Sequence, residues 1–278
     1  MTHQRFLSQP GTLQLTVPGG TLAYDLQGTG PLVLLVPGMG ELRSSYRFLA
    51  PALVDAGYRV ATVDLRGHGD SSASFGSYGD VETASDITML LRELAVPAVV
   101  VGNSMAAGAA VIVAAEHSAL VEGLVLIGPF VRDPSSVGAL QRLLFRVMMA
   151  RPWAASVWNA YLPKLHAGRK PVDFPEYRRA VVAALRRPGY AQAFSLTTRT
   201  DHVRADESLA AVQAPTLVVM GDKDPDFPDP QAEATWIGDA LGGSSVMIGD
   251  AGHYPQSQQP EQTSTAIVGF LRTLGRHA

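Results

Sequence analysis

Apolar and polar residues alternate along two short segments near the start of the chain. Residues 13–17 and 21–26 each place apolar side chains at about every second position, and residues 18–20, Pro-Gly-Gly, separate them. This alternation is typical of strands with one buried face, so the pattern predicts an antiparallel hairpin at the edge of a sheet. The pattern changes at residues 32–36, Leu-Val-Leu-Leu-Val. An uninterrupted aliphatic run predicts a strand that is buried on both faces, as in a parallel sheet.

Buried strands and amphipathic helices then alternate along most of the chain. Further strands are expected at residues 58–63, 98–101, 124–127, 216–220 and 245–248, and helices at residues 46–56, 80–94, 106–116 and 261–274. This alternation predicts an α/β fold, in which helices cover both sides of a mostly parallel sheet.

One stretch, residues 132–204, interrupts the alternation. It contains no convincing buried strand, only helical segments separated by proline and glycine. Its thirteen lysines and arginines against four acidic residues give it a net charge of +9, so the remaining chain carries −12 of the total of −3. The sequence therefore predicts an α/β core formed by residues 1–131 and 205–278, with residues 132–204 inserted as a helical lid.

The composition restricts the class of protein. A chain of 278 residues, 46% of them hydrophobic, is long enough for one large domain with a well-filled core. A net charge of −3 gives no electrostatic reason to expect nucleic-acid binding. The absence of cysteine excludes disulfides, thiolate metal sites and a cysteine nucleophile. We find neither a signal-peptide pattern nor an apolar run long enough to span a membrane, so we expect a cytoplasmic protein, and the oligomeric state stays open.

A candidate nucleophile follows the expected strand 98–101. The segment 102–106, Gly-Asn-Ser-Met-Ala, opens a helix, so Ser104 occupies a sharp strand-to-helix turn. Such a turn strains the backbone, exposes the hydroxyl group and needs small neighbours two positions before and after it. Gly102 meets this requirement, and Ala106 replaces the usual glycine at the cost of one methyl group. The flanking strand and helix favour this interpretation over an ordinary loop.

A serine hydroxyl needs a base to take its proton, and the base needs an acidic group to orient it. Among seven histidines, His253 is best placed because it follows the last expected strand in a Gly-His pair. His68 is a rival, but it precedes the serine and is interpreted as a loop-shaping residue, while His166 is assigned to a solvated helix face. Asp224 follows another expected strand and is the candidate acid. The chain order Ser104, Asp224, His253 is that of one known kind of serine triad.

The acidic residues near Asp224 suggest a second interpretation. Asp222, Asp224, Asp226 and Glu233 fall at positions 1, 3, 5 and 12 of a calcium-loop pattern. However, Phe227 stands where that pattern requires glycine, and a strand precedes the segment where a helix is needed. We therefore reject calcium here, and we expect neither a metal nor any other cofactor.

Two backbone amides are candidates for binding the negative oxygen that forms when a nucleophile attacks a carbonyl group. One belongs to Met105, directly after Ser104. The other belongs to Met39 in the segment 37–40, Pro-Gly-Met-Gly, after the first expected parallel strand. Donors at these two positions would form an oxyanion hole. Taken alone, the glycine-rich segment is equally typical of an ordinary turn.

Five motifs resemble, in order, those of the α/β-hydrolase superfamily. They are residues 37–40, residues 64–71 (Asp-Leu-Arg-Gly-His-Gly-Asp-Ser), residues 102–106, Gly221 with Asp224, and Gly252-His253. The resemblance spans the chain except residues 132–204, which are similar to the variable lid of that family. It implies the α/β-hydrolase fold and a serine hydrolase. Pro37 departs from the histidine often found there, which puts the anchoring of the oxyanion loop in question.

The serine nucleophile narrows the activities that the resemblance implies. Epoxide hydrolases and haloalkane dehalogenases of this fold use aspartate, so they are disfavoured, and cleavage of a carboxylic ester through an acyl-enzyme is favoured. Asn103-Ser104-Met105 resembles the elbow of carbon–carbon hydrolases of meta-fission products, although those usually carry Trp where this chain has Tyr254. A perhydrolase, a lyase and a non-catalytic ligand receptor on the same scaffold stay open as alternatives.

The lid is expected to select the substrate, a small molecule with an apolar acyl group. Aromatic and flexible apolar side chains are suited to contacting such a group. The candidate substrate-binding residues are Phe145, Met149, Trp153, Trp158 and Phe194 in the lid and Tyr254 beside the candidate base. The alternative for most of these side chains is that they pack the lid helices onto the core.

Overall fold

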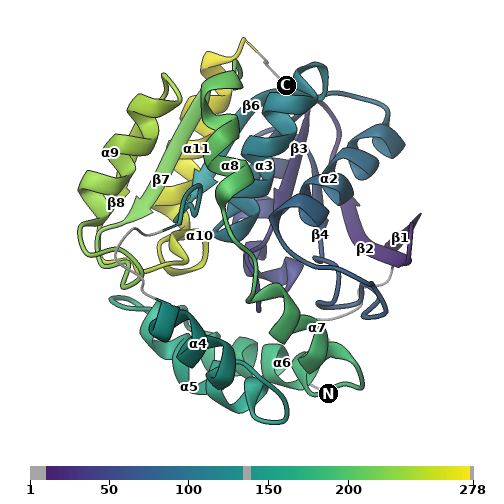
Figure 1. The fold of residues 1–278 in the computed structure, drawn as a ribbon. Coiled ribbons are helices and arrows are strands. Elements are labelled where there is room, and N and C mark those ends of the chain that lie inside the picture. Colours follow the sequence, from purple (N-terminus) through teal and green to yellow (C-terminus); the bar gives the residue numbers. More distant parts are fainter. Residues whose placement is uncertain (1–10, 134–138, 276–278) are drawn as a thin grey trace.

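The computed structural model describes residues 11–133 and 139–275, which contain one eight-stranded sheet (Figure 1). The strand order is β1-β2-β4-β3-β5-β6-β7-β8. The strands are β1 (Leu13–Val17), β2 (Gly20–Gln27), β3 (Leu32–Val36), β4 (Arg59–Val63), β5 (Ala98–Asn103), β6 (Val121–Ile127), β7 (Thr216–Gly221) and β8 (Ser244–Ile248). β2 pairs antiparallel with β1 and β4, and the remaining pairs are parallel. The predicted edge hairpin and mostly parallel sheet are confirmed.

Helices cover both faces of this sheet. α2 (Asp80–Leu94), α3 (Met105–Glu116) and α9 (Pro230–Ala240) pack on one face, and α1 (Leu49–Asp55) and α11 (Pro260–Thr273) on the other. The shorter segments are η2 (Arg43–Tyr46), η3 (Ser118–Leu120), α8 (Val203–Ser208), η4 (Leu209–Ala211) and α10 (Pro255–Gln258). No helix in the described part of the chain is long and apolar enough to cross a membrane.

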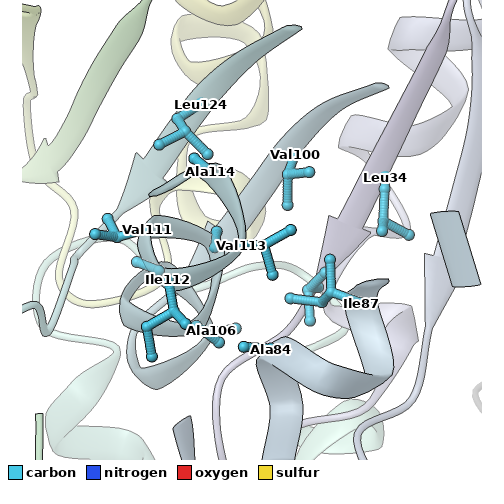
Figure 2. Close-up of a cluster of buried hydrophobic side chains, with 14 of the residues drawn as sticks. Leu34, Ala84, Ile87, Val100, Ala106, Val111, Ile112, Val113, Ala114 and Leu124 are labelled. Carbon is cyan, nitrogen blue, oxygen red and sulfur yellow. The ribbon is translucent and has the colours of Figure 1, made fainter. Parts of the chain in front are cut away.

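Successive residues of the central strands belong to opposite halves of the core. Leu34, Val100 and Leu124 lie on the face of α2 and α3 (Figure 2), whereas Val33 and Val99 lie with α1 and α11. Because side chains alternate along a strand and both faces are covered, every position must be apolar. This is the physical reason for the uninterrupted aliphatic runs in the sequence.

Four more helices form a separate group at one end of the sheet, below it in Figure 1. They are α4 (Ala139–Met148), α5 (Ala154–Leu165), α6 (Phe174–Leu185) and α7 (Tyr190–Thr197). They share a hydrophobic cluster that includes Trp158, Tyr177 and Phe194, and that cluster also takes in Leu42 and Tyr254 from the segments after β3 and β8. The helical group is thereby packed against the end of the sheet where the parallel strands terminate.

The helix expected at residues 46–56 is the clearest difference from the sequence prediction. The structure has the short turn η2 and then α1, which begins at Leu49. Pro51 explains the break, because its ring would clash with the carbonyl group of residue 47 in a continuous helix. Helix α9 was not predicted from the sequence either, although Asp229 accepts a hydrogen bond from the amide of Ala232 as an N-terminal cap, with Pro230 at the first helical position.

The buried guanidinium of Arg43 joins three acidic side chains, one from β2 and two from the segment after β4. It contacts Asp64 after β4, and it donates to Asp25 in β2 (2.7 Å) and to Asp70 (2.9 Å). Burial disfavours its charged form, but the nearby carboxylates outweigh this effect and raise the pKa of Arg43. The network therefore fixes the segments after β3 and β4 against the antiparallel edge of the sheet.

We expect Arg43→Ala to lower the free energy of unfolding by about 3–5 kcal/mol, because Asp64 would stay buried without its counter-charge. Urea unfolding at pH 7 measures this change. Arg179→Ala is the control, since Arg179 is half-exposed and pairs with Glu176 on the surface of α6 at 3.1 Å; its loss should stay below about 1 kcal/mol. Equal losses in the two variants would contradict the assigned role of the buried network.

Candidate active site

Ser104 lies at the turn between β5 and α3, with φ 58° and ψ −126°. A residue other than glycine rarely adopts such a backbone conformation, so the surroundings must hold it. Its amide donates to the carbonyl oxygen of Ile127 at the end of β6 (2.9 Å). A Cβ atom at Gly102 would lie 2.4 Å from the carbonyl oxygen of Ala106, so this position requires glycine. Ala106 itself is fully buried in the core, which accommodates its methyl group.

His253 and Asp224 form a buried pair after β8 and β7. Nδ1 of His253 donates to Oδ2 of Asp224 at 2.7 Å, and both side chains are almost completely buried. Burial disfavours the imidazolium, but the charge and hydrogen bond of Asp224 outweigh it and raise the pKa of His253. Because Nδ1 donates to the carboxylate, Nε2 is the nitrogen left to accept a proton.

Ser104 and His253 line one cavity of 590 Å³, a size typical of small-molecule sites. Asn103 links the backbones around them, since its Nδ2 donates to the carbonyl oxygens of Ile127 (2.9 Å) and His253 (3.3 Å). A Cβ atom at Gly128 would lie 3.0 Å from Nδ1 of His253, so the loop after β6 passes directly against the imidazole. The ends of neighbouring parallel strands thus bring together residues that are distant in the sequence.

The loop after β3 is anchored by two aromatic side chains. The Gly40 amide donates to Nε2 of His68 (2.9 Å), and the Gly40 carbonyl accepts from Nε1 of Trp158 (3.0 Å). Burial lowers the pKa of His68 to about 4, which keeps the imidazole neutral and able to accept that bond. His68 therefore shapes this loop, as expected, and these contacts hold it although Pro37 replaces the usual histidine.

The Met39 and Met105 amides are both available to a ligand. Met105 is the first residue of α3, so its N–H group has no acceptor within the helix. No described residue accepts a hydrogen bond from the Met39 amide. A Cβ atom at Gly38 would lie 2.9 Å from the Cβ of Ser104, so the loop passes close to the serine. This arrangement suits the binding of a negative oxygen beside Ser104.

Glu41 was not identified from the sequence. It follows the Met39 loop, is buried, and accepts a 2.6 Å hydrogen bond from the hydroxyl group of Tyr177 in α6. Burial raises the pKa of Glu41 to about 7. Because its partner lies 136 residues further along the chain, no local motif could have indicated this link between the loop and the helical group.

The structure separates the candidate substrate-binding residues into two sets. Phe145, Trp158 and Tyr254 line the cavity that contains Ser104. Met149 and Phe194 are buried in the hydrophobic cluster of the helical group, to which Trp158 and Tyr254 also belong, but they do not line the cavity. Trp153 is 46% exposed and does not line the cavity; its Nε1 donates to a backbone carbonyl oxygen within the helical group. The orientation of each helix, which the sequence does not fix, decides which side chains reach the cavity.

Asp226 is a further acidic residue on the cavity wall. Its Oδ2 lies 3.7 Å from Nδ1 of His253, and its Oδ1 accepts a hydrogen bond from Tyr161 of α5 (2.9 Å). The ligand atoms of Asp224, Asp226 and His253 lie within 4.8 Å of one another, close enough to hold a metal ion. In the structure, however, each of the three groups already has a hydrogen-bond partner.

The other carboxylates of the calcium-loop pattern have different partners. Glu233 pairs with Arg132 (2.7 Å), and Asp222 accepts from the amide of Ala251 (3.2 Å). They are therefore not directed at a common point with Asp224, which agrees with the rejection of calcium.

His166 differs from its sequence prediction. It was expected on a solvated helix face, but it is 1% exposed and lies between the rings of Phe174 (4.4 Å) and Tyr254 (4.7 Å). It ends α5, where Nδ1 lies 3.0 Å from the carbonyl oxygen of Leu162. Burial lowers its pKa to about 3, so it is neutral and serves to pack the helical group against the loop of His253.

Comparisons with known proteins cover most of the chain. Residues 33–266 match the model of the alpha/beta hydrolase family. The chain is 27% identical over 271 residues to 2-(acetamidomethylene)succinate hydrolase of Mesorhizobium japonicum, with 90% of this chain and 91% of that protein covered. It is 26% identical over 284 residues to an uncharacterised protein of Mycobacterium tuberculosis, covering 95% and 82%. A thermophilic esterase from Thermogutta terrifontis, solved with malate bound, has a TM-score of 0.81 and 25% identity, covering 98% and 100%.

The pKa of His253 should depend on Asp224. In the wild type we expect its Cε1–H proton NMR signal to titrate above the ordinary histidine value of 6.5. Asp224→Asn removes the charge that favours the imidazolium while burial remains, so this pKa should fall by roughly 1–3 units. Asp239→Asn, which removes an exposed negative charge on α9, should leave it unchanged. An unaltered titration in Asp224→Asn would show that the pair does not set the protonation of His253.

Proposed function

The chain belongs to the alpha/beta hydrolase family, and we propose that it hydrolyses a carboxylic ester of a small molecule through an acyl-enzyme on Ser104. The observation that carries this proposal is the strained turn that presents Ser104 in the same cavity as His253, which is hydrogen-bonded to Asp224. A hydroxyl group, an imidazole and an orienting carboxylate in this arrangement are the requirements of nucleophilic acyl transfer. The esterase likeness of the whole fold is consistent with this reaction.

In the first half-reaction Ser104 attacks the ester carbonyl. Nε2 of His253 takes the hydroxyl proton as Oγ bonds to the carbonyl carbon, and the carbonyl electron pair moves onto oxygen. The Met39 and Met105 amides bind that oxyanion. When the intermediate collapses, the bond to the alcohol oxygen breaks and His253 returns its proton to the leaving alcohol. The acyl group then remains on Ser104.

In the second half-reaction water takes the place of the alcohol. His253 removes a proton from water as its oxygen bonds to the acyl carbon, and the same two amides hold the new oxyanion. Collapse breaks the bond to Ser104 Oγ, which recovers its proton from His253. Asp224 remains a carboxylate throughout and stabilises the imidazolium that forms in each half.

The helical group acts in this proposal as a lid, residues 132–204, over a core of residues 1–131 and 205–278. Side chains of α4 and α5 supply an apolar wall to the cavity, namely Leu144, Phe145, Met148 and Trp158. Tyr254 continues this wall beside the base. Such a wall favours an apolar acyl chain, because transfer of each methylene group out of water stabilises binding by about 0.8 kcal/mol.

Ser104→Ala should abolish ester hydrolysis, with kcat reduced by about four to six orders of magnitude. A fluorophosphonate should add once to the wild type and not to Ser104→Ala, as measured by intact mass. Ser257→Ala is the matched control, since Ser257 is a buried serine in α10 outside the cavity, and its variant should still be labelled. The absence of an adduct on folded wild-type protein would contradict an activated serine and favour the ligand-receptor alternative.

Two adjacent leucines of α4 test the apolar wall. Leu144 lines the cavity and Leu143 does not, although both are about half-exposed. Leu144→Ala should lower kcat/KM for 4-nitrophenyl octanoate about three- to tenfold relative to the acetate, since only the long chain reaches this side chain. Leu143→Ala should leave the ratio of octanoate to acetate unchanged. Equal effects of the two substitutions would exclude α4 as a wall of the acyl site.

A further inference from the structure

A second histidine–aspartate pair lies at the same cavity and takes no part in the proposed reaction. Nδ1 of His202 is 2.7 Å from Oδ2 of Asp80, the first residue of α2. The other oxygen of Asp80 accepts from the hydroxyl group of Thr200 (3.0 Å), so this carboxylate is held on both sides. Asp80 is almost completely buried, whereas His202 lines the cavity together with Ser104 and is 11% exposed.

Phe130 places this pair close to the reacting groups. Its ring is stacked on His202, with centroids 5.5 Å apart, and meets the ring of His253 edge-on at 6.0 Å. A Cβ atom at Gly108 of α3 would lie 2.6 Å from the Phe130 carbonyl oxygen and 2.8 Å from Asp80 Oδ2. The two imidazoles therefore contact the same phenyl ring and line the same cavity.

The hydrogen bond to Asp80 fixes which nitrogen of His202 is available. Nδ1 must donate to the carboxylate, and Nε2 has no partner among the described residues. Burial disfavours the imidazolium, but the hydrogen bond and charge of Asp80 outweigh it and raise the pKa of His202. In the protonated state, Nε2 is a charged N–H donor, which pairs best with an anionic oxygen.

The cavity that His202 lines carries two further cationic side chains. Arg146 and Arg199 line the cavity, and neither guanidinium group forms a hydrogen bond or ion pair with a side chain of the described residues. The acidic residues on the wall are Asp133, which accepts from the amide of His202, and Asp226, which accepts from Tyr161. The two arginines therefore add positive charge to the cavity that His202 lines.

We propose that His202, held by Asp80, is a subsite that binds a carboxylate group carried by the substrate. The proposal rests on the proposed ester hydrolysis and specifies the substrate class: an ester with an apolar body and a carboxylate several carbon atoms from the scissile bond. A carboxylate satisfies the Nε2 donor with a charge-assisted hydrogen bond. A neutral carboxamide in the same place accepts only an ordinary hydrogen bond, which is about half as strong as a charge-assisted one.

The test compares esters that differ only in this charge. Mono-4-nitrophenyl esters of succinic, glutaric and adipic acid carry the carboxylate on the acyl side, and 4-acetoxybenzoate carries it on the alcohol side. For each, the matching carboxamide is the neutral control. In at least one pair, the wild type should hydrolyse the carboxylate with a kcat/KM at least about tenfold that of the carboxamide. The difference should come mainly from a lower KM for the carboxylate. Ratios near one in every pair would overturn the proposal.

His202→Gln and Asp80→Asn should both change the preferred substrate pair of the wild type. In each variant, the ratio of kcat/KM for the carboxylate to kcat/KM for the carboxamide should be close to one. The first variant removes the charged donor, and the second removes the charge that maintains it. Folding is checked by circular dichroism. Arg186→Gln, which removes an exposed positive charge of the lid outside the cavity, should keep the wild-type ratio. A loss of the ratio in Arg186→Gln as well would assign the preference to long-range steering and overturn the subsite.

The ratio should also fall as pH rises through the pKa of His202, because the imidazolium is then lost. The groups facing His202 are Asp80 from α2, Asp133 from the loop after β6, and Asp201 with Arg199 in its own segment. His253 titrates beyond Phe130, but its protonation affects both members of each pair and cancels in the ratio. A ratio that does not change with pH would contradict the role of His202.

Direct binding separates failure of this inference from failure of the proposed function. Calorimetry with Ser104→Ala should detect monomethyl glutarate, which should bind about tenfold or more tightly than its carboxamide. The double variant Ser104→Ala/His202→Gln should lose that difference. If no ester is hydrolysed but the difference is found, the proposed reaction is wrong and the anion subsite stands. If esters are hydrolysed and the two ligands bind equally, the subsite is wrong and the reaction stands.

Discussion

The backbone of Ser104 is held in a conformation that residues other than glycine rarely adopt, and much of the structure can be understood as the means of holding it. Such strain costs of the order of 1–3 kcal/mol. It is offset by the fully buried small residues of α3, which pack that helix closely on the sheet, and by the hydrogen bond from the Ser104 amide to β6. The same close packing leaves Gly102 and Gly108 without room for a side chain.

Four histidines show how strongly position decides the chemistry of one residue type. His68 and His166 are buried without a carboxylate partner, so burial is the dominant effect and lowers their pKa. His253 and His202 are also largely buried, but each donates Nδ1 to an aspartate, and the balance is reversed. The first two therefore serve as neutral packing and accepting groups. The second two are suited to carry a proton or a positive charge.

The sequence was sufficient for the features that depend on neighbouring residues. Aliphatic runs located the parallel strands because both faces of the sheet are covered, and the elbow around Ser104 could be identified because its requirements for small residues are local. The chain order of motifs then placed Asp224 and His253 at strand ends. Two prolines mark helix boundaries that were not predicted. Pro51 breaks the expected first helix, and Pro230 begins α9.

Features that depend on the packing of distant segments were beyond the sequence. Asp80 and His202 are 122 residues apart, and Glu41 and Tyr177 are 136 apart, so neither pair has a local pattern. The orientation of the helices in the helical group decided that Phe145 and Trp158 line the cavity while Met149 and Phe194 do not. A helix with apolar residues on several sides gives no sign of which side will face a ligand.

The cavity combines two kinds of surface whose requirements are opposed. The side chains of α4 and α5 gain from contact with an apolar chain, whereas His202, Arg146 and Arg199 are better satisfied by an acceptor or by water. A wholly apolar ligand would strip water from the cationic side without replacing its hydrogen bonds, and a wholly polar one would leave the apolar wall hydrated. Both ligands would therefore bind more weakly than one that carries an apolar chain and an anionic group. Polar groups left without hydrogen-bond partners discriminate between ligands more strongly than the size of an apolar pocket does. The shape of the fold places Ser104 at the cavity, and in the proposed reaction the placement of unpaired donors decides which ester is held there long enough to react.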